Sequence, residues 1–137
     1  MGEQPIKGSC LCGKITYEVQ GPVKMFQYCM CSRCRKFTGS AHAANIIVPE
    51  NKFKWLTGEE ILGYYPHPEA KHFATGFCKN CGSSLPYKVQ NAPVFVVTAG
   101  TLDDDPGIKP MHSIFWDSKA NWFEETCNLQ KFAETPK

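Results

Sequence analysis

The chain has 137 residues, 42% of them hydrophobic and 20% charged, with a formal net charge of +2. This length suits one domain, expected over residues 1–137 with flexible or peripheral ends at 1–7 and about 128–137. The small charge, without a block of like charges, gives no reason to expect nucleic acid as a partner. No apolar run could span a bilayer or act as a signal peptide, so we expect a cytoplasmic protein without a membrane partner.

The predicted elements are short strands separated by turns. Apolar Ile15, Tyr17 and Val19 alternate with polar residues, which is the pattern of a half-buried strand. A helical turn is predicted over residues 32–38, ended by Gly39. Further strands are predicted over residues 23–30, 43–48, 52–56, 61–65, 85–90, 94–98 and 113–116. Because no long stretch has helical period and no linker divides the chain, the sequence predicts an all-β protein.

Seven of the eight cysteines fall in three clusters. They are Cys10 and Cys12, then Cys29, Cys31 and Cys34, then Cys78 and Cys81. A disulfide framework requires a secretory context, and cysteines two residues apart would close a strained ring. Tetrahedral zinc, with Zn–S bonds of about 2.3 Å, needs sulfurs roughly 3.8 Å apart, which both spacings can supply. The clusters therefore predict metal binding.

Seven thiols make one four-ligand site and leave three over. Spacing alone leaves open which pairs combine, but the most economical split joins the two pairs that each end in glycine, Cys10/Cys12 and Cys78/Cys81. Such a closed zinc site contributes about 10–16 kcal/mol of apparent binding free energy to folding. The remaining cluster of Cys29, Cys31 and Cys34 would then hold a metal with one vacant position.

The three-thiolate site favours one kind of chemistry. Zinc with three thiolates carries a formal charge of −1, which makes it a weak Lewis acid but a good holder of a soft ligand such as a substrate thiolate. Arg33, Arg35 and Lys36 stand beside the cluster and would offset the charge or grip carboxylates of an acidic thiol. In the alternative, Cys127, a histidine or an acidic residue completes the site and makes it purely structural.

Other residues receive structural assignments. Cys127 is expected to be a buried apolar cysteine, and His67 and His72 to be surface or core residues. His112 remains open as an acid or orienting group. Residues 103–105 are expected to form a solvated acidic loop. Four aromatic residues are expected in the core: Phe115, Trp116, Trp122 and Phe123.

Four segments carry a family resemblance: Gly-Ser-Cys-Leu-Cys-Gly at 8–13, the run from Cys29 to Ser40, Phe-Cys-Lys-Asn-Cys-Gly-Ser at 77–83, and residues 99–103. Together they resemble the glutathione-dependent formaldehyde-activating enzyme family, which includes centromere protein V, over residues 8 to about 123. The resemblance implies an Mss4-like fold of short coiled antiparallel sheets and two zinc ions per chain. It implies a structural zinc on Cys10, Cys12, Cys78 and Cys81, and a catalytic zinc on Cys29, Cys31 and Cys34.

The resemblance also implies an activity. The family is named for joining glutathione and formaldehyde into S-hydroxymethylglutathione, a carbon–sulfur lyase reaction, so glutathione and a small aldehyde are the expected partners. Ser32 and Arg33 are expected to position the substrate. Met30 stands where the family often has histidine. Two alternatives stay open, a zinc-stabilised binding module and a thiol redox enzyme using Cys127, and the sequence leaves a homodimer open.

Overall fold

The computed structural model describes residues 4–136 as short strands with one short α-helix, which confirms the all-β prediction. The strands are β1 (Ile6–Ser9), β2 (Thr16–Val19), β3 (Phe26–Cys29), β4 (Ala43–Pro49), β5 (Phe53–Thr57), β6 (Leu62–Pro66), β7 (Ala74–Cys78), β8 (Ser84–Leu85), β9 (Tyr87–Lys88), β10 (Val94–Thr98) and β11 (His112–Ile114). The helices are α1 (Ser32–Thr38) and the 3-10 turns η1 (Glu50–Lys52), η2 (Glu59–Ile61), η3 (Ala99–Thr101), η4 (Trp116–Ser118) and η5 (Thr126–Asn128).

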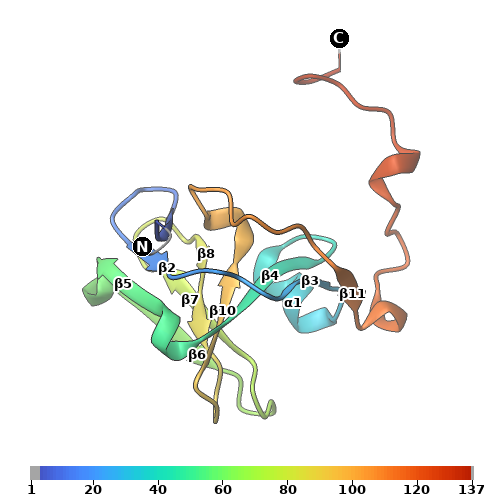
Figure 1. Cartoon of the computed structure of the whole chain (residues 1–137). Coiled ribbons are helices and arrows are strands. Elements are labelled where there is room, and N and C mark those ends of the chain that lie inside the picture. The colour runs from blue at the N-terminus through green and yellow to red at the C-terminus, as the bar shows by residue number, and fades with distance from the viewer. Residues whose placement is uncertain (1–3, 137) are drawn as a thin grey trace.

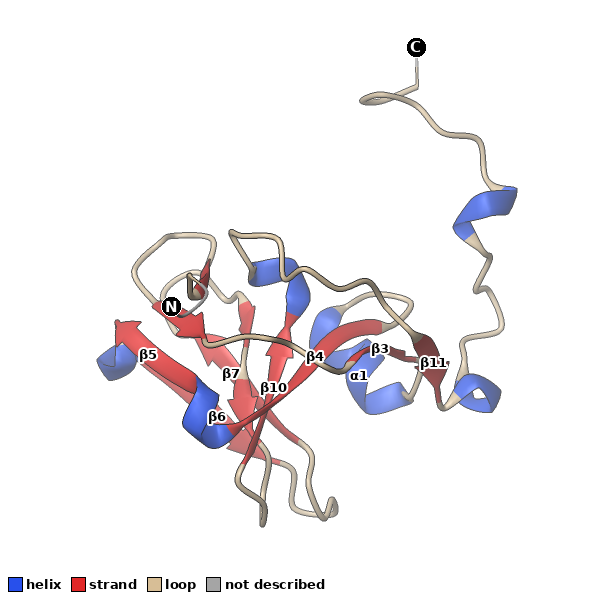
Figure 2. Cartoon of the chain, viewed as in Figure 1, coloured by secondary structure: helices blue, strands red, loops and turns tan. Residues whose placement is uncertain are grey.

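The strands form three small sheets (Figures 1 and 2). Their strand orders are β1-β2-β5, β11-β3-β4-β10-β9 and β6-β7-β8. Every pairing is antiparallel except that of β11 with β3, which is parallel. The five-stranded sheet carries α1 at the end of β3, so this sheet positions the middle cysteine cluster.

The main core lies where β2, β4, β5 and β10 meet. The predicted alternation on β2 is confirmed, because Ile15, Tyr17 and Val19 are all buried. The ring of Phe53 stacks between those of Tyr17 and Phe95, with centroid distances of 5.3 and 4.0 Å. Stacked and edge-on aromatic pairs add to the free energy gained from apolar burial.

The ends of the chain differ in part from expectation. Strand β1 begins at Ile6, which pairs with Val19, so the expected lead-in over residues 1–7 is wrong for residues 6 and 7. Residues 1–3 and 137 lie outside the described residues. Residues 128–136 are all exposed and extend away from the body (Figure 2).

Two expectations about the C-terminal third are wrong. Phe115, Trp116 and Trp122 are exposed rather than in the core, and Trp122 keeps 69% of its surface accessible. Cys127 is also exposed. The reason is topological: β11 has three residues and is the edge of its sheet, and within residues 115–136 only Ala120 is buried.

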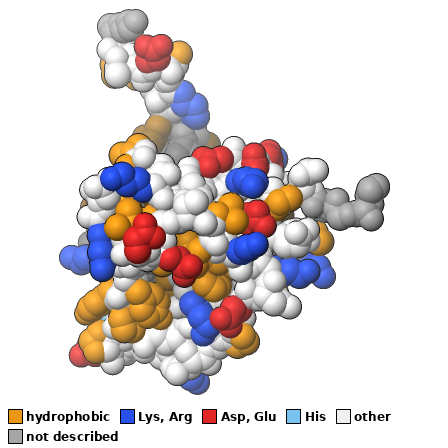
Figure 3. Space-filling view, turned by 90° about the vertical axis from the view of Figure 1, so that its left-hand side faces the viewer, with side chains coloured by type: hydrophobic (Ala, Val, Ile, Leu, Met, Phe, Trp, Pro, Cys, Tyr) orange, Lys and Arg blue, Asp and Glu red, His pale blue; other side chains and the backbone are white. Residues whose placement is uncertain are grey.

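Charged side chains are mixed on the surface. On the face drawn in Figure 3, basic and acidic side chains intermingle among apolar ones, and no stripe of one sign forms there. No helix within residues 4–136 is both long and apolar enough to cross a membrane.

Two glycines with positive φ, Gly58 before η2 and Gly107, differ in how closely other atoms pack around them. Gly58 has φ +85°, and a Cβ there would overlap the carbonyl oxygen of Lys14 and lie 2.8 Å from the Cα of Ile15. Gly107 has φ +77° with open space around it. We expect Gly107→Ala to cost about 1 kcal/mol from backbone strain alone, and Gly58→Ala about 3 kcal/mol because backbone must also move. Urea unfolding at fixed zinc concentration measures both, and equal costs would contradict the packing argument.

Candidate metal centres

The first centre brings together four cysteines from two distant hairpins. Cys10 and Cys12 lie in the turn between β1 and β2, Cys78 is the last residue of β7, and Cys81 lies in the turn between β7 and β8. The Sγ atoms of Cys10 and Cys12 are 3.5 Å apart, those of Cys12 and Cys78 are 3.8 Å apart, and all four lie within 4.8 Å of one another. These separations match the edges of a tetrahedral zinc site.

Neighbouring donors favour the thiolate form in this cluster. The backbone N–H of Ile15 donates to Cys10 Sγ and that of Cys81 donates to Cys78 Sγ, each at 3.4 Å. The hydrogen bond with the Ser83 hydroxyl, at 3.2 Å, is the main cause that lowers the pKa of Cys81 to about 5. Burial instead raises the pKa of Cys78. A metal ion would replace the proton that this buried thiol keeps.

The second centre forms where β3 runs into α1. Cys29 is the last residue of β3, Cys31 caps the N-terminus of α1, and Cys34 lies in its first turn. The N–H of Cys34 donates to Cys31 Sγ at 3.4 Å, and the three sulfurs lie within 4.8 Å of one another. Cys29 and Cys34 are each 4% exposed, whereas Cys31 is partly exposed.

This second cluster offers three ligands. Within residues 4–136, no histidine, aspartate, glutamate or further cysteine joins the group at this spacing. Cys127, one candidate for a fourth ligand, lies in the exposed C-terminal segment with its sulfur 3.8 Å from the side-chain oxygen of Asn128. The cluster is therefore accessible to a fourth ligand from solution through Cys31.

The three thiols share protons unequally. Hydrogen bonds from Cys29 and Cys34 hold the pKa of Cys31 far below the usual value for a thiol. The partners in these hydrogen bonds shift the opposite way. The contact with Cys31 raises the pKa of Cys29, and the contacts with Cys29 and Cys31 raise the pKa of Cys34. In the absence of a metal, Cys31 is thus the thiolate and its two neighbours are the proton donors.

Met30 does not face the cysteines. Its N–H donates to the carbonyl of Ile114 at 3.1 Å, so it continues the line of β3. Because side chains alternate along a strand, those of Tyr28 and Met30 project from the face opposite to that of Cys29. Met30 is fully buried there and lines a cavity with Tyr28 and His42. The side chain at position 30, where the family resemblance implies that a histidine often stands, therefore points away from this centre.

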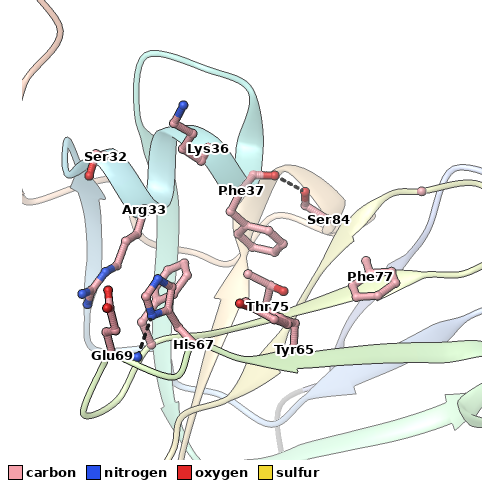
Figure 4. Close-up of a pocket in the computed structure, with 12 residues that line it drawn as sticks. Ser32, Arg33, Lys36, Phe37, Tyr65, His67, Glu69, Thr75, Phe77 and Ser84 are labelled. Carbon is pink, nitrogen blue, oxygen red and sulfur yellow. Dashed lines mark hydrogen bonds between the residues drawn. The ribbon is translucent and has the colours of Figure 1, made fainter.

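A cleft of about 580 Å³ lies beside α1, the helix that carries Cys34 (Figure 4); Ser32 and Arg33 line it, but none of the three cysteines does. Its walls come from α1, β6, β7 and the loops beside them: Ser32, Arg33, Lys36, Phe37, Tyr65, His67, Glu69, Phe73, Thr75, Phe77, Gly82 and Ser84. Phe73 links the two features, since it lines the cleft and also packs against the buried cysteines. Ser84 Oγ donates to the carbonyl of Phe37 at 2.9 Å, which fixes α1 against β8.

The cleft carries charges of both signs. Arg33 and Lys36 come from α1, and Glu69 from the loop after β6. The side chain of Arg33 extends toward Glu69 (Figure 4), but the one ion pair among the described residues joins Lys7 and Glu18. Both groups therefore remain free to bind a ligand that carries a carboxylate and an ammonium group.

Sequence reasoning placed some residues here and missed others. Ser32 and Arg33, which were expected to position substrate, line the cleft, whereas Arg35 does not line it and its Nε donates to the carbonyl of Met30 at 3.3 Å. Of the two roles expected for Arg35, this contact with the backbone beside Cys29 and Cys31 fits the offsetting of charge at the cluster better than the binding of a substrate carboxylate. His67 and Glu69 line the cleft, although nothing local in the sequence marks them.

Two further expectations concern polar residues outside the centres. The ring of His112 pairs with Gln27 at 2.9 Å and belongs to neither cysteine cluster. In the acidic loop, Asp103 accepts from Ser9 Oγ at 2.7 Å and Asp104 from the N–H of Lys7 at 2.9 Å. These carboxylates are exposed, as expected, and they also tie the loop to β1.

The short coiled sheets and the cysteine clusters, which could hold zinc, define a small all-β protein of the Mss4-like class. Residues 5–118 match the family model described as glutathione-dependent formaldehyde-activating enzyme, and the chain belongs to this family. No curated protein matches the chain. A crystal structure of a Rhodobacter sphaeroides protein matches with a TM-score of 0.60 and 23% identity, covering 78% of this chain and 98% of that one, which supports the fold.

The unequal sharing of protons predicts which thiol reacts first. In folded protein depleted of metal at the three-cysteine cluster, we expect iodoacetamide at pH 6 to modify Cys31 well before Cys34. The reason is that the lowered pKa keeps Cys31 ionised at this pH, while the raised pKa keeps Cys34 protonated and unreactive. Peptide mass spectrometry over time measures both, with circular dichroism to verify folding. Faster modification of Cys34 in folded protein would contradict this assignment.

Proposed function

We propose that this protein is a zinc-dependent carbon–sulfur lyase acting on a thiol–aldehyde adduct, with glutathione and formaldehyde as the leading substrate pair. One observation carries the proposal: a cluster of three cysteine ligands has no fourth ligand among the described residues, and Ser32 and Arg33, which lie between two of these cysteines in the chain, line a cleft of about 580 Å³. The chain's family supports it, because the family is named for this chemistry. A purely structural centre would be expected to have four protein ligands.

The two centres take different roles in this proposal. A structural zinc would be held by Cys10, Cys12, Cys78 and Cys81. These four ligands fill a tetrahedral site and leave no position for substrate. Cys29, Cys31 and Cys34 hold the catalytic zinc. When bound, a zinc ion with three thiolates lowers the pKa of a substrate thiol and keeps it as the nucleophile.

The cleft supplies the groups that orient a peptide-like thiol. Arg33 presents a fork of N–H donors that matches a carboxylate, and Lys36 adds a second positive charge. Glu69 accepts from a substrate ammonium group. Phe73 gives an apolar floor between these charges and the cysteines, and Ser32 offers a hydroxyl directly after Cys31.

The bond changes balance without an oxidant. The thiol loses its proton, and its sulfur bonds to the aldehyde carbon. The carbonyl π electrons move to oxygen, which takes up one proton, so no proton is gained or lost overall. The reverse step cleaves the carbon–sulfur bond and returns thiol and aldehyde. This chemistry does not use Cys127, so it differs from a thiol redox mechanism.

Exchange NMR tests the activity directly. Mixing zinc-loaded protein with glutathione and formaldehyde should accelerate exchange between free thiol and S-hydroxymethyl adduct above the spontaneous rate. Cys31→Ser should abolish the acceleration because it removes the accessible ligand, whereas Cys127→Ser should leave it unchanged. A rate equal to the spontaneous one, with zinc bound, would sink the proposal and favour the binding module. Loss of activity in Cys127→Ser alone would favour the redox enzyme.

Substitutions of two arginines in α1 distinguish an effect on substrate binding from an effect on the helix. We expect Arg33→Gln to raise KM for glutathione about tenfold, because a charge-assisted contact to a carboxylate is lost. Arg35→Gln is the matched control, since Arg35 bonds to backbone carbonyls outside the cleft and should leave KM unchanged. Initial rates over a range of glutathione concentrations measure both, and an equal rise in KM for the two variants would exclude Arg33 as the carboxylate ligand.

Metal analysis separates the two centres. The native protein should bind two zinc ions. Cys78→Ser should lose one of them and most of the folding stability, because a structural zinc contributes about 10–16 kcal/mol. Cys31→Ser should also lose one but keep a folded core. Elemental analysis and thermal unfolding give the two readouts, and a fold that survives Cys78→Ser with two zinc ions bound would overturn the assignment.

A further inference from the structure

A second cavity lies on the other side of β3 from the cysteines. It encloses about 200 Å³ between the end of β3, the start of β4 and the segment that follows β11. Residues 116–126 pass over this edge of the five-stranded sheet, where β11 and β3 lie side by side (Figure 1). Because Tyr28 and Met30 alternate with Cys29, this cavity and the three-cysteine cluster open on opposite faces.

Aromatic rings make up most of its wall. The ring of His42 stacks on that of Tyr28 at 4.2 Å and meets that of Phe123 edge-on at 6.3 Å. Phe123 in turn meets Trp116 edge-on at 5.8 Å. Four rings from three separated parts of the chain therefore surround one space, and fully buried Met30 also lines it.

Among the described residues that line the cavity, the one acidic side chain is that of Glu125, and none is a lysine or an arginine. Nδ1 of His42 donates to the carbonyl of Ala43 at 3.1 Å, which fixes the orientation of this ring in the wall. Trp116 already attracts a cation from outside the cavity: Nζ of Lys119 lies 4.5 Å from its ring centroid.

We propose that this cavity binds a small organic cation with a methylated ammonium head. Faces of Trp and Tyr rings attract such a head through their π electrons, and a nearby carboxylate adds a full opposite charge. A methylated head has few or no N–H groups to satisfy, which suits a wall made of rings. The volume admits a head of this size and excludes a peptide. The proposal does not depend on zinc chemistry, because the ligand would enter the face opposite the cysteines.

A charged ligand and its neutral isostere test the proposal. Zinc-loaded, full-length protein labelled with ¹⁵N is titrated with choline and, separately, with 3,3-dimethyl-1-butanol, which has the same shape without the charge. Choline should produce saturable shifts in the indole N–H of Trp116 and the amides of Tyr28, His42 and Phe123, and the alcohol should bind at least about tenfold more weakly. Equal binding of the two, or no saturable shift with choline, would overturn the proposal.

Variants locate the binding. Glu125→Gln should weaken choline binding about fivefold and Trp116→Leu about tenfold, since each removes one source of attraction. Both side chains are exposed enough to be replaced without disturbing the core. Glu124→Gln is the matched control, because Glu124 does not line the cavity and accepts from Asn128 at 2.7 Å instead. Equal weakening in Glu124→Gln and Glu125→Gln would show general electrostatic attraction and reject the site.

Discussion

The convergence of four sulfurs between two hairpins is the constraint on which the rest of the structure depends. The turn at Cys10 ends the β1–β2 hairpin and the turn at Cys78 ends the β7–β8 hairpin, so this contact joins two of the three sheets. Around it, the buried apolar residues are few: Ile15 and Leu85 pack directly against the cysteines. Because a domain of this size has a net stability of about 5–15 kcal/mol, a bound metal here would supply a share as large as the whole.

The two centres use the same local turn and differ in what meets it. In each, a cysteine N–H donates to the sulfur three residues earlier at 3.4 Å, from Cys81 to Cys78 and from Cys34 to Cys31. At the first centre, a second hairpin brings two more sulfurs and closes the site. At the second, β3 supplies Cys29 and no hairpin within residues 4–136 brings a further ligand, so the cluster stays open at the partly exposed Cys31. Whether a cluster is closed or open is thus decided by tertiary arrangement, with the local turn held constant.

Local signals explain which features the sequence could predict. The alternation of Ile15, Tyr17 and Val19 and the α1 bounds depend on neighbours within a few positions, and both predictions are confirmed. The cleft depends on β6 and β7 meeting α1, and its His67 and Glu69 lie more than thirty residues beyond Arg33. Apolar character alone also misplaced Trp122 and Cys127, because hydrophobic residues are buried only where an element covers them, and most of the described chain after β11 is exposed.

Strand alternation at β3 has a consequence for how substitutions in this family should be read. Consecutive residues there serve different sites: Cys29 enters the metal cluster, while Tyr28 and Met30 line the cavity on the opposite face. A substitution at position 30 therefore alters the wall of that cavity more directly than the environment of the thiolates. Met30 still connects the two faces through its backbone, because its carbonyl accepts from Arg35 on the helix that carries Cys34. A change of side chain at position 30 that preserves this hydrogen bond leaves the geometry of the open centre in place.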